Sequence, residues 1–132
     1  MTERPTAQWR RYLEEQEASI AAGTLNPESD DAFALRLYPA AFTADVDAAL
    51  TEFEEDVDRA ELARDEEVWR LIERVVVSLN SVSERWELIE TDEREELCQY
   101  IDDIMTEGAD LSALVARSRI ARSEVTGQWR EW

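Results

Sequence analysis

The chain has no histidine, no lysine and only one cysteine among its 132 residues. Without histidine it cannot carry Ser-His-Asp or Cys-His catalysis, a histidine metal site or the Glu-x-x-His ligands of a di-iron bundle. The single cysteine cannot form an internal disulfide, which fits the reducing cytoplasm. Apolar runs stay short of the ~20 residues that cross a membrane, and no signal-peptide pattern opens the chain. We therefore expect a cytoplasmic protein without membrane contact or cofactor.

The chain does have one strongly periodic apolar stretch, between Val68 and Trp86. Its apolar residues recur at steps of three and four, which places side chains on one face of an α-helix. They are Val68, Leu71, Ile72, Val75, Val76, Leu79, Val82 and Trp86. We predict a largely buried helix from about 66 to 86, with Val77 widening its apolar face and the other helices packed around it.

Weaker patterns of the same kind flank this stretch, and none of them indicates a strand. A short helix is expected at 33–38, the third helix should end near Leu62, and Gly23 and Gly108 should end the first and fifth. The expected helix caps are Thr6, Thr43, Thr91, Asp110 and Ser123. The sequence therefore predicts one all-α domain over residues 1–132, a single bundle of about five to seven helices, because 132 residues suit one domain.

The net charge of −18 is concentrated in two segments. Residues 43–67 carry eleven acidic residues against two arginines, and residues 84–107 carry ten against two. Helices with these outer faces would present a broad negative surface that steers a basic protein partner, although a merely solvated surface is the plain alternative. The candidate partner-binding residues are Asp45, Glu52, Glu55, Asp56, Asp58, Glu61, Trp86, Glu90, Asp92, Glu93, Glu95, Glu96, Asp102 and Asp103.

Enzymatic chemistry would have to rely on carboxylates. Glu52 with Glu55, and Glu93 with Glu96, have the i, i+3 spacing with which helical nucleotide hydrolases hold Mg²⁺. Such pairs arise by chance in so acidic a chain, and no Gly-rich loop or basic phosphate cluster accompanies them. Cys98 is expected to be a buried packing residue, because nearby carboxylates disfavour a thiolate. We expect neither an enzyme nor a metal site.

Nucleic acid is not expected as a partner, because a protein with a net charge of −18 repels phosphate. The same charge leaves a different relation to nucleic acid open. Carboxylates can stand in for phosphates, so a regulator that mimics nucleic acid and occupies a DNA-binding protein is an alternative to a protein-specific inhibitor.

Residues 79–101, LNSVSERWELIETDEREELCQYI, resemble a pattern found in bacterial immunity proteins that are encoded beside polymorphic toxins. The similarity covers the end of the predicted central helix near Leu79-Asn80 and the stretch Ile89-Glu90-Thr91-Asp92-Glu93-Arg94-Glu95-Glu96-Leu97 that follows it. It implies an antitoxin that inhibits by binding a toxin domain and covering or distorting its active site. Toxins that act on nucleic acids tend to be basic, so the resemblance and the acidic charge together predict a nuclease or nucleic-acid deaminase as the partner.

Overall fold

The computed structural model describes residues 2–132, apart from the side chain of Ser123. In this part of the chain there are six α-helices, two short 3₁₀ turns and no strand, which confirms the predicted all-α fold. The α-helices are α1 (Pro5–Ala21), α2 (Ala34–Leu37), α3 (Ala40–Arg59), α4 (Asp65–Trp86), α5 (Thr91–Gly108) and α6 (Leu111–Ser118). The 3₁₀ turns are η1 (Asp30–Ala32) and η2 (Arg122–Glu124). No helix among the described residues is long and apolar enough to cross a membrane.

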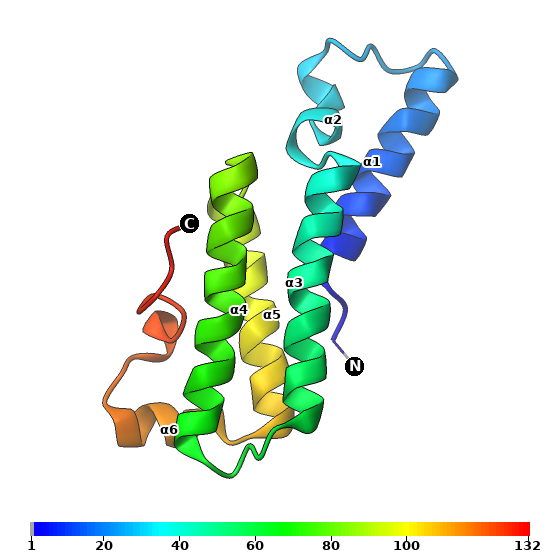
Figure 1. Ribbon diagram of the computed structural model, residues 1–132. Coiled ribbons are helices and arrows are strands. Elements are labelled where there is room, and N and C mark those ends of the chain that lie inside the picture. Colours follow the sequence, from blue (N-terminus) through cyan, green and yellow to red (C-terminus); the bar gives the residue numbers. More distant parts are fainter. Residues whose placement is uncertain (1) are drawn as a thin grey trace.

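Helices α3, α4 and α5 form the body of the molecule (Figure 1). α3 and α4 lie side by side in opposite directions, and α5 lies behind them and runs in the direction of α3. α1 and α2 cover the first half of α3. α6 and the segment that follows it, residues 119–132, lie on the other side of α4; these residues are called here the C-terminal segment. The start of α3, the end of α4 and the start of α5 therefore meet at one end of the bundle, called here the upper end.

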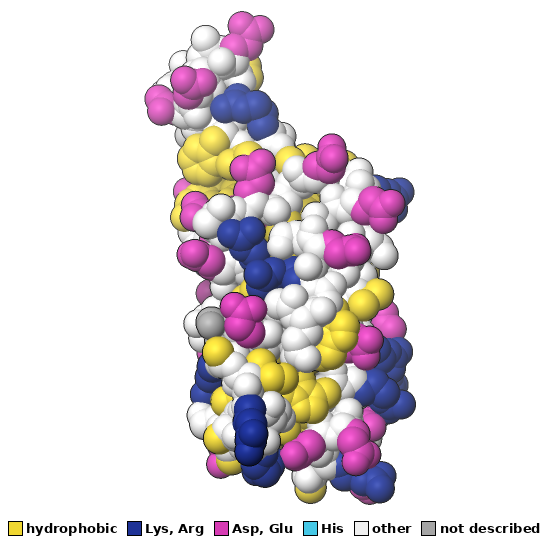
Figure 2. All heavy atoms as spheres, turned by 90° about the vertical axis from the view of Figure 1, so that its left-hand side faces the viewer, with side chains coloured by type: hydrophobic (Ala, Val, Ile, Leu, Met, Phe, Trp, Pro, Cys, Tyr) yellow, Lys and Arg dark blue, Asp and Glu magenta, His cyan; other side chains and the backbone are white. Residues whose placement is uncertain are grey.

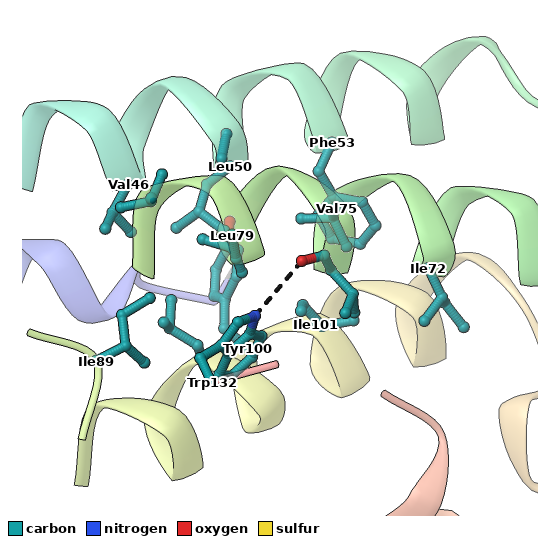
Figure 3. Close-up of a cluster of buried hydrophobic side chains, with 14 of the residues drawn as sticks. Val46, Leu50, Phe53, Ile72, Val75, Leu79, Ile89, Tyr100, Ile101 and Trp132 are labelled. Carbon is teal, nitrogen blue, oxygen red and sulfur yellow. Dashed lines mark hydrogen bonds between the residues drawn. The ribbon is translucent and has the colours of Figure 1, made fainter. Parts of the chain in front are cut away.

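The core lies along one face of α4, as its periodicity predicts. All seven of its predicted apolar positions from Val68 to Val82 are buried. They pack with Leu50 and Phe53 of α3 and with Ile101 of α5 (Figure 3). The C-terminal segment closes this cluster, where the Trp132 Nε1 donates a hydrogen bond of 3.4 Å to the backbone carbonyl of Val76.

Val77 does not widen the apolar face, so that prediction is wrong. Its side chain is 48% exposed, and it is the one large hydrophobic residue described as exposed. Each helical residue advances about 100°, so Val77 lies opposite Val68 on the helix. α4 is thus buried along one side rather than all round.

Several predicted helix starts are displaced, because Pro39 and tertiary contacts determine them. Arg4 and Pro39 occupy the N-cap positions of α1 and α3, so Thr6 and Thr43 lie inside the helices and are buried. α3 also ends at Arg59 instead of Leu62. Thr91 is the first residue of α5 rather than its cap. The Asp110 cap is confirmed, since its Oδ1 accepts a hydrogen bond of 3.0 Å from the Ala113 N–H.

The terminal helix predicted from Ser123 does not form. Arg122–Glu124 is a 3₁₀ turn, and the segment continues as turns to residue 129. Val125 and Trp132 are nevertheless buried, so this segment packs through separate anchors. Two of its backbone groups bind Asn80 of α4: the Asn80 Nδ2 donates to the Trp129 carbonyl, and the Glu131 N–H donates to the Asn80 Oδ1, both at 2.8 Å. These bonds stabilise an irregular backbone whose own hydrogen bonds are only those of short turns.

Candidate protein-binding surface

Among the predicted residues, the exposed carboxylates that have no partner lie at opposite ends of the bundle. Glu55, Asp58 and Glu61 are in the last turns of α3 or just after it, and Glu90, Asp92 and Glu95 are just before α5 or in its first turns. None of these six side chains has an ion pair or hydrogen bond among the described residues. α5 runs in the direction of α3, so its 18 residues separate the two groups by about 25 Å. The acidic surface is therefore not one continuous patch of free charge.

Most of the predicted residues on α3 have partners within the fold. Asp45 accepts a hydrogen bond of 2.8 Å from the Trp86 Nε1 and pairs with Arg85. Asp56, whose side chain is only 10% exposed, forms ion pairs of 3.0 Å with Arg59 and 3.2 Å with Arg74. Glu52 also pairs with Arg74, at 3.3 Å. These carboxylates hold α3 against α4, and charge reversal there would weaken the fold together with any surface.

Trp86 is half-buried and is also engaged within the fold. Besides its bond to Asp45, its ring meets the ring of Phe42 edge-on, with 6.2 Å between the ring centroids. Both its polar and its apolar parts therefore have partners in this chain.

The predicted residues on α5 divide in the same way. The Glu96 Oε2 accepts a hydrogen bond of 2.9 Å from the Nε1 of the buried Trp9. Asp102 binds Arg122 through two hydrogen bonds of 2.7 and 2.8 Å, and Asp103 accepts from Gln99 at 2.8 Å. Only the three carboxylates in the first turns of α5 or just before it are left for an external partner.

Glu93 is buried, contrary to its predicted place on the binding surface. Its residue is only 4% exposed, and this burial raises the pKa of its carboxyl group, with the nearby negative charges of Glu96, Asp92 and Glu90 acting in the same direction. A hydrogen bond from the residue's own backbone offsets part of the shift. Its carboxylate contributes to the field of the upper end but cannot touch a partner.

At the upper end the fold brings together acidic residues that the sequence left separate. Glu84, Glu87, Glu90 and Glu131 line a recess of about 520 Å³, in which Ile89 and Trp132 supply apolar surface. This corner recess has no arginine in its wall. Sequence reasoning identified only Glu90 of these four, because the position of Glu131 depends on the path of the irregular C-terminal segment. Glu84 and Glu87 could have been found from their i, i+3 spacing at the helix end.

Glu87 occupies an unfavourable position for its residue type. It follows the last residue of α4 with φ 54° and ψ 36°, the left-handed region in which glycine or asparagine usually ends a helix. Its negative charge also lies at the negative end of the helix dipole. The left-handed conformation costs roughly 1–2 kcal/mol, and the charge at the helix end costs about 0.3–1 kcal/mol. Because Glu87 destabilises the fold at this position, it is a candidate for a functional residue.

The two glutamate pairs with i, i+3 spacing have other surroundings in the fold. Glu52 is bound to Arg74 and Glu93 is buried, while Glu96 is occupied by Trp9. Among the described residues, no group of three Asp, Glu or Cys side chains is placed to hold a metal ion.

Cys98 packs against the core as predicted, but it is half-buried rather than buried. Its Sγ lies 3.2 Å from the Thr126 Oγ1 and accepts a hydrogen bond of 3.4 Å from the Arg130 Nη1. Both partners come from the C-terminal segment, whose position the sequence did not reveal.

Comparison with known proteins finds no matching protein family, curated protein or solved structure. The function of this chain must therefore be inferred from its own residues and geometry.

Proposed function

We propose that this chain is an acidic inhibitor that binds a basic protein partner through the corner recess. The observation that carries the proposal is the recess itself: four carboxylates, no arginine and two apolar side chains around one hollow. The resemblance of residues 79–101 to immunity proteins supports a cognate toxin domain as the partner, with a nuclease or nucleic-acid deaminase as its expected activity. Inhibition would follow from covering the toxin's active site.

The recess has the chemistry to receive an arginine or lysine side chain. A guanidinium or ammonium group would gain charge-assisted hydrogen bonds from several carboxylates, while its aliphatic stem would lie against Ile89 and Trp132. The overall charge of −18 would accelerate the approach of a basic partner, and the recess would fix its position.

A nucleic-acid mimic is less well supported. Such a mimic needs a row of free carboxylates that follows the spacing of a phosphate backbone. Along the middle of the bundle, however, the carboxylates of α3 are neutralised by Arg74 and Arg85, and the free ones lie at the two ends. This arrangement favours a local contact at one end. A magnesium-dependent hydrolase finds no support in the described residues, since no metal-binding group is formed.

The proposal is tested by two matched sets of substitutions. The corner set changes Glu84, Glu87, Glu90 and Glu131 to Gln. The control set makes the same change in charge at the lower end, where Glu55, Glu61 and Glu66 become Gln and Asp58 becomes Asn; all four are exposed. Each variant is titrated with the toxin domain that the proposal expects beside this chain, at two salt concentrations, after circular dichroism has confirmed the fold.

The corner set should weaken binding at least tenfold, corresponding to about 1.4 kcal/mol. The control set should only slow association, and this effect should fade at higher salt. If both sets weakened binding equally, the negative charge of the protein would act only as a general electrostatic field, and the corner recess would have no specific role. Binding that neither set changes would refute the proposal.

A further inference from the structure

A cavity of about 570 Å³ lies between α5 and the C-terminal segment and shares no lining residue with the corner recess. One stripe of α5 forms a wall of it, with Arg94, Cys98 and Asp102 at successive turns and the buried Ile101 and Met105 beside them. Leu111 of α6 and Val125 complete the apolar part of the lining. The volume lies within the range of about 300–1,000 Å³ typical of small-molecule sites, and such sites combine apolar walls with a few polar groups.

The arginines of this cavity are unusual in so acidic a protein. Nine of the fourteen arginines form ion pairs within 4.0 Å among the described residues. Arg94 and Arg130 are not among them, although the chain has 32 acidic residues. Both line the same cavity. Two arginines without carboxylate partners therefore occur together.

Arg130 is held in place by uncharged groups. Its Nη1 donates to the Thr126 Oγ1 at 3.0 Å and to the Cys98 Sγ at 3.4 Å, and its guanidinium lies 5.5 Å from the centre of the Trp132 ring. These contacts orient the side chain and leave its positive charge unneutralised. The Arg94 side chain makes no hydrogen bond or ion pair with another described residue and is half-exposed at the cavity wall.

The charge of this cavity is opposite to that of the corner recess. Three arginines, Arg94, Arg122 and Arg130, face two carboxylates, of which Asp102 is already bound by Arg122. Figure 2 views the side of the molecule that carries the C-terminal segment, and dark-blue arginine side chains lie near the middle of this face between dispersed carboxylates. The cavity therefore offers an anion two cationic groups that no carboxylate of the chain occupies.

We infer that this cavity binds a small amphiphilic anion. The oxyanion head, a carboxylate or phosphate, bonds Arg94 and Arg130, and its hydrocarbon part lies along Ile101, Met105 and Val125. Arginine suits both heads, because its planar guanidinium binds two oxygens at once. An inorganic anion would leave the apolar wall in contact with water, so an organic ligand fits the lining better. The site is separate from the corner recess, and its test does not depend on the toxin partner.

The first experiment titrates the protein with octanoate, octyl phosphate, acetate and the neutral octanamide, followed by amide chemical shifts. Octanoate or octyl phosphate should bind with one-to-one saturation, at least tenfold more tightly than acetate or octanamide, and the tighter of the two identifies the head group. Arg94→Gln should weaken this binding at least fivefold. Arg94 has no partner in the fold, so the variant should melt like the parent. Arg64→Gln, which removes an exposed arginine outside the cavity, should change nothing.

A second experiment uses Cys98 as a reporter of the local charge. Cys98 is alkylated with anionic iodoacetate and, separately, with neutral iodoacetamide, and the iodoacetate rate is divided by the iodoacetamide rate. The same ratio is measured for a reference cysteine introduced by Ser81→Cys in a Cys98→Ala background. The ratio should be at least threefold higher at Cys98 than at position 81, and Arg94→Gln should lower it. The inference is overturned if octanoate and octyl phosphate bind no better than octanamide, if Arg94→Gln leaves their affinity unchanged, or if Cys98 reacts with neither reagent and the cavity is thus closed.

Discussion

The middle of α3 and the corner recess are both rich in carboxylates, but they differ in how many of these carboxylates have an arginine partner. On α3, Asp45, Asp47, Glu52, Glu54 and Asp56 all have an arginine partner within the fold. In the corner recess, four glutamates share one hollow without any arginine. The comparison teaches that the net charge of a segment does not reveal which carboxylates are free. Pairing separates those that stabilise the fold from those available to a partner.

Asp47 provides the largest test of this difference. It accepts hydrogen bonds from the buried Thr6, at 2.5 Å, and from Arg4 and Arg10, and its side chain is only 16% exposed. Asp47→Ala would leave the Thr6 hydroxyl and the Arg10 side chain without this partner, while Arg4 would keep its contacts with Glu54 and Thr51. We expect the free energy of unfolding to fall by about 1–3 kcal/mol, measured by urea denaturation.

Asp58→Ala is the matched control for Asp47. Asp58 is exposed on the same helix and has no partner among the described residues, so its loss should change stability by less than about 0.5 kcal/mol. Similar losses in the two variants would contradict the division between paired and free carboxylates.

Glu87 tests the other side of the comparison. Glu87→Gly relieves the left-handed strain and removes a negative charge from the end of α4, at some cost in the entropy of the unfolded chain. We expect a gain of about 0.5–1 kcal/mol in stability together with weaker binding of the basic partner. Thermal melting and the toxin titration measure the two effects on the same sample.

Arg119→Gly is the control for backbone strain outside the corner recess. Arg119 follows α6 with φ 57°, so glycine relieves the same strain there. This variant should gain less stability than Glu87→Gly, because it also removes a positive charge that the end of α6 favours, and it should lose no affinity. A Glu87→Gly variant that binds as tightly as the parent would show that Glu87 is strained for no functional reason.

The core could be predicted from the sequence, but much of the candidate site could not. α4 repeats its apolar spacing for several turns, so the sequence indicates its buried face, including Val75 and Leu79. The C-terminal segment has no such period, and its path depends on Asn80, whose two bonds to the backbone at Trp129 and Glu131 have no local signature. The corner recess and the arginine-lined cavity both include residues of this segment. Neither could therefore be assembled before the fold was known.

The pairing of individual carboxylates was beyond the sequence for a related reason. Asp102 and Asp103 are neighbours, yet one binds Arg122 through two bonds and the other accepts only from Gln99. The partner of Asp102 comes from a turn twenty residues away. Charge counting gives the field of a segment, whereas tertiary contacts decide which charges remain free.

The smallest expected effect concerns Glu93, which belongs to neither group because it is buried without an arginine. Burial raises the pKa of its carboxyl group above the ordinary value of 4.5. A raised pKa in the folded state means that folding favours the protonated form. The resulting stability is fully present below pH 4.5 and is lost as the pH rises through the folded-state pKa.

Glu93→Gln, which resembles the protonated side chain, should therefore melt slightly above the parent at pH 7 and together with it at pH 4. Glu95→Gln is the control, since it removes the same charge from an exposed position on α5. Its melting temperature relative to the parent should change less between pH 7 and pH 4 than that of Glu93→Gln. An advantage of Glu93→Gln that grew toward pH 4 would mean that the folded state favours the carboxylate, and Glu93 would then belong with the paired residues.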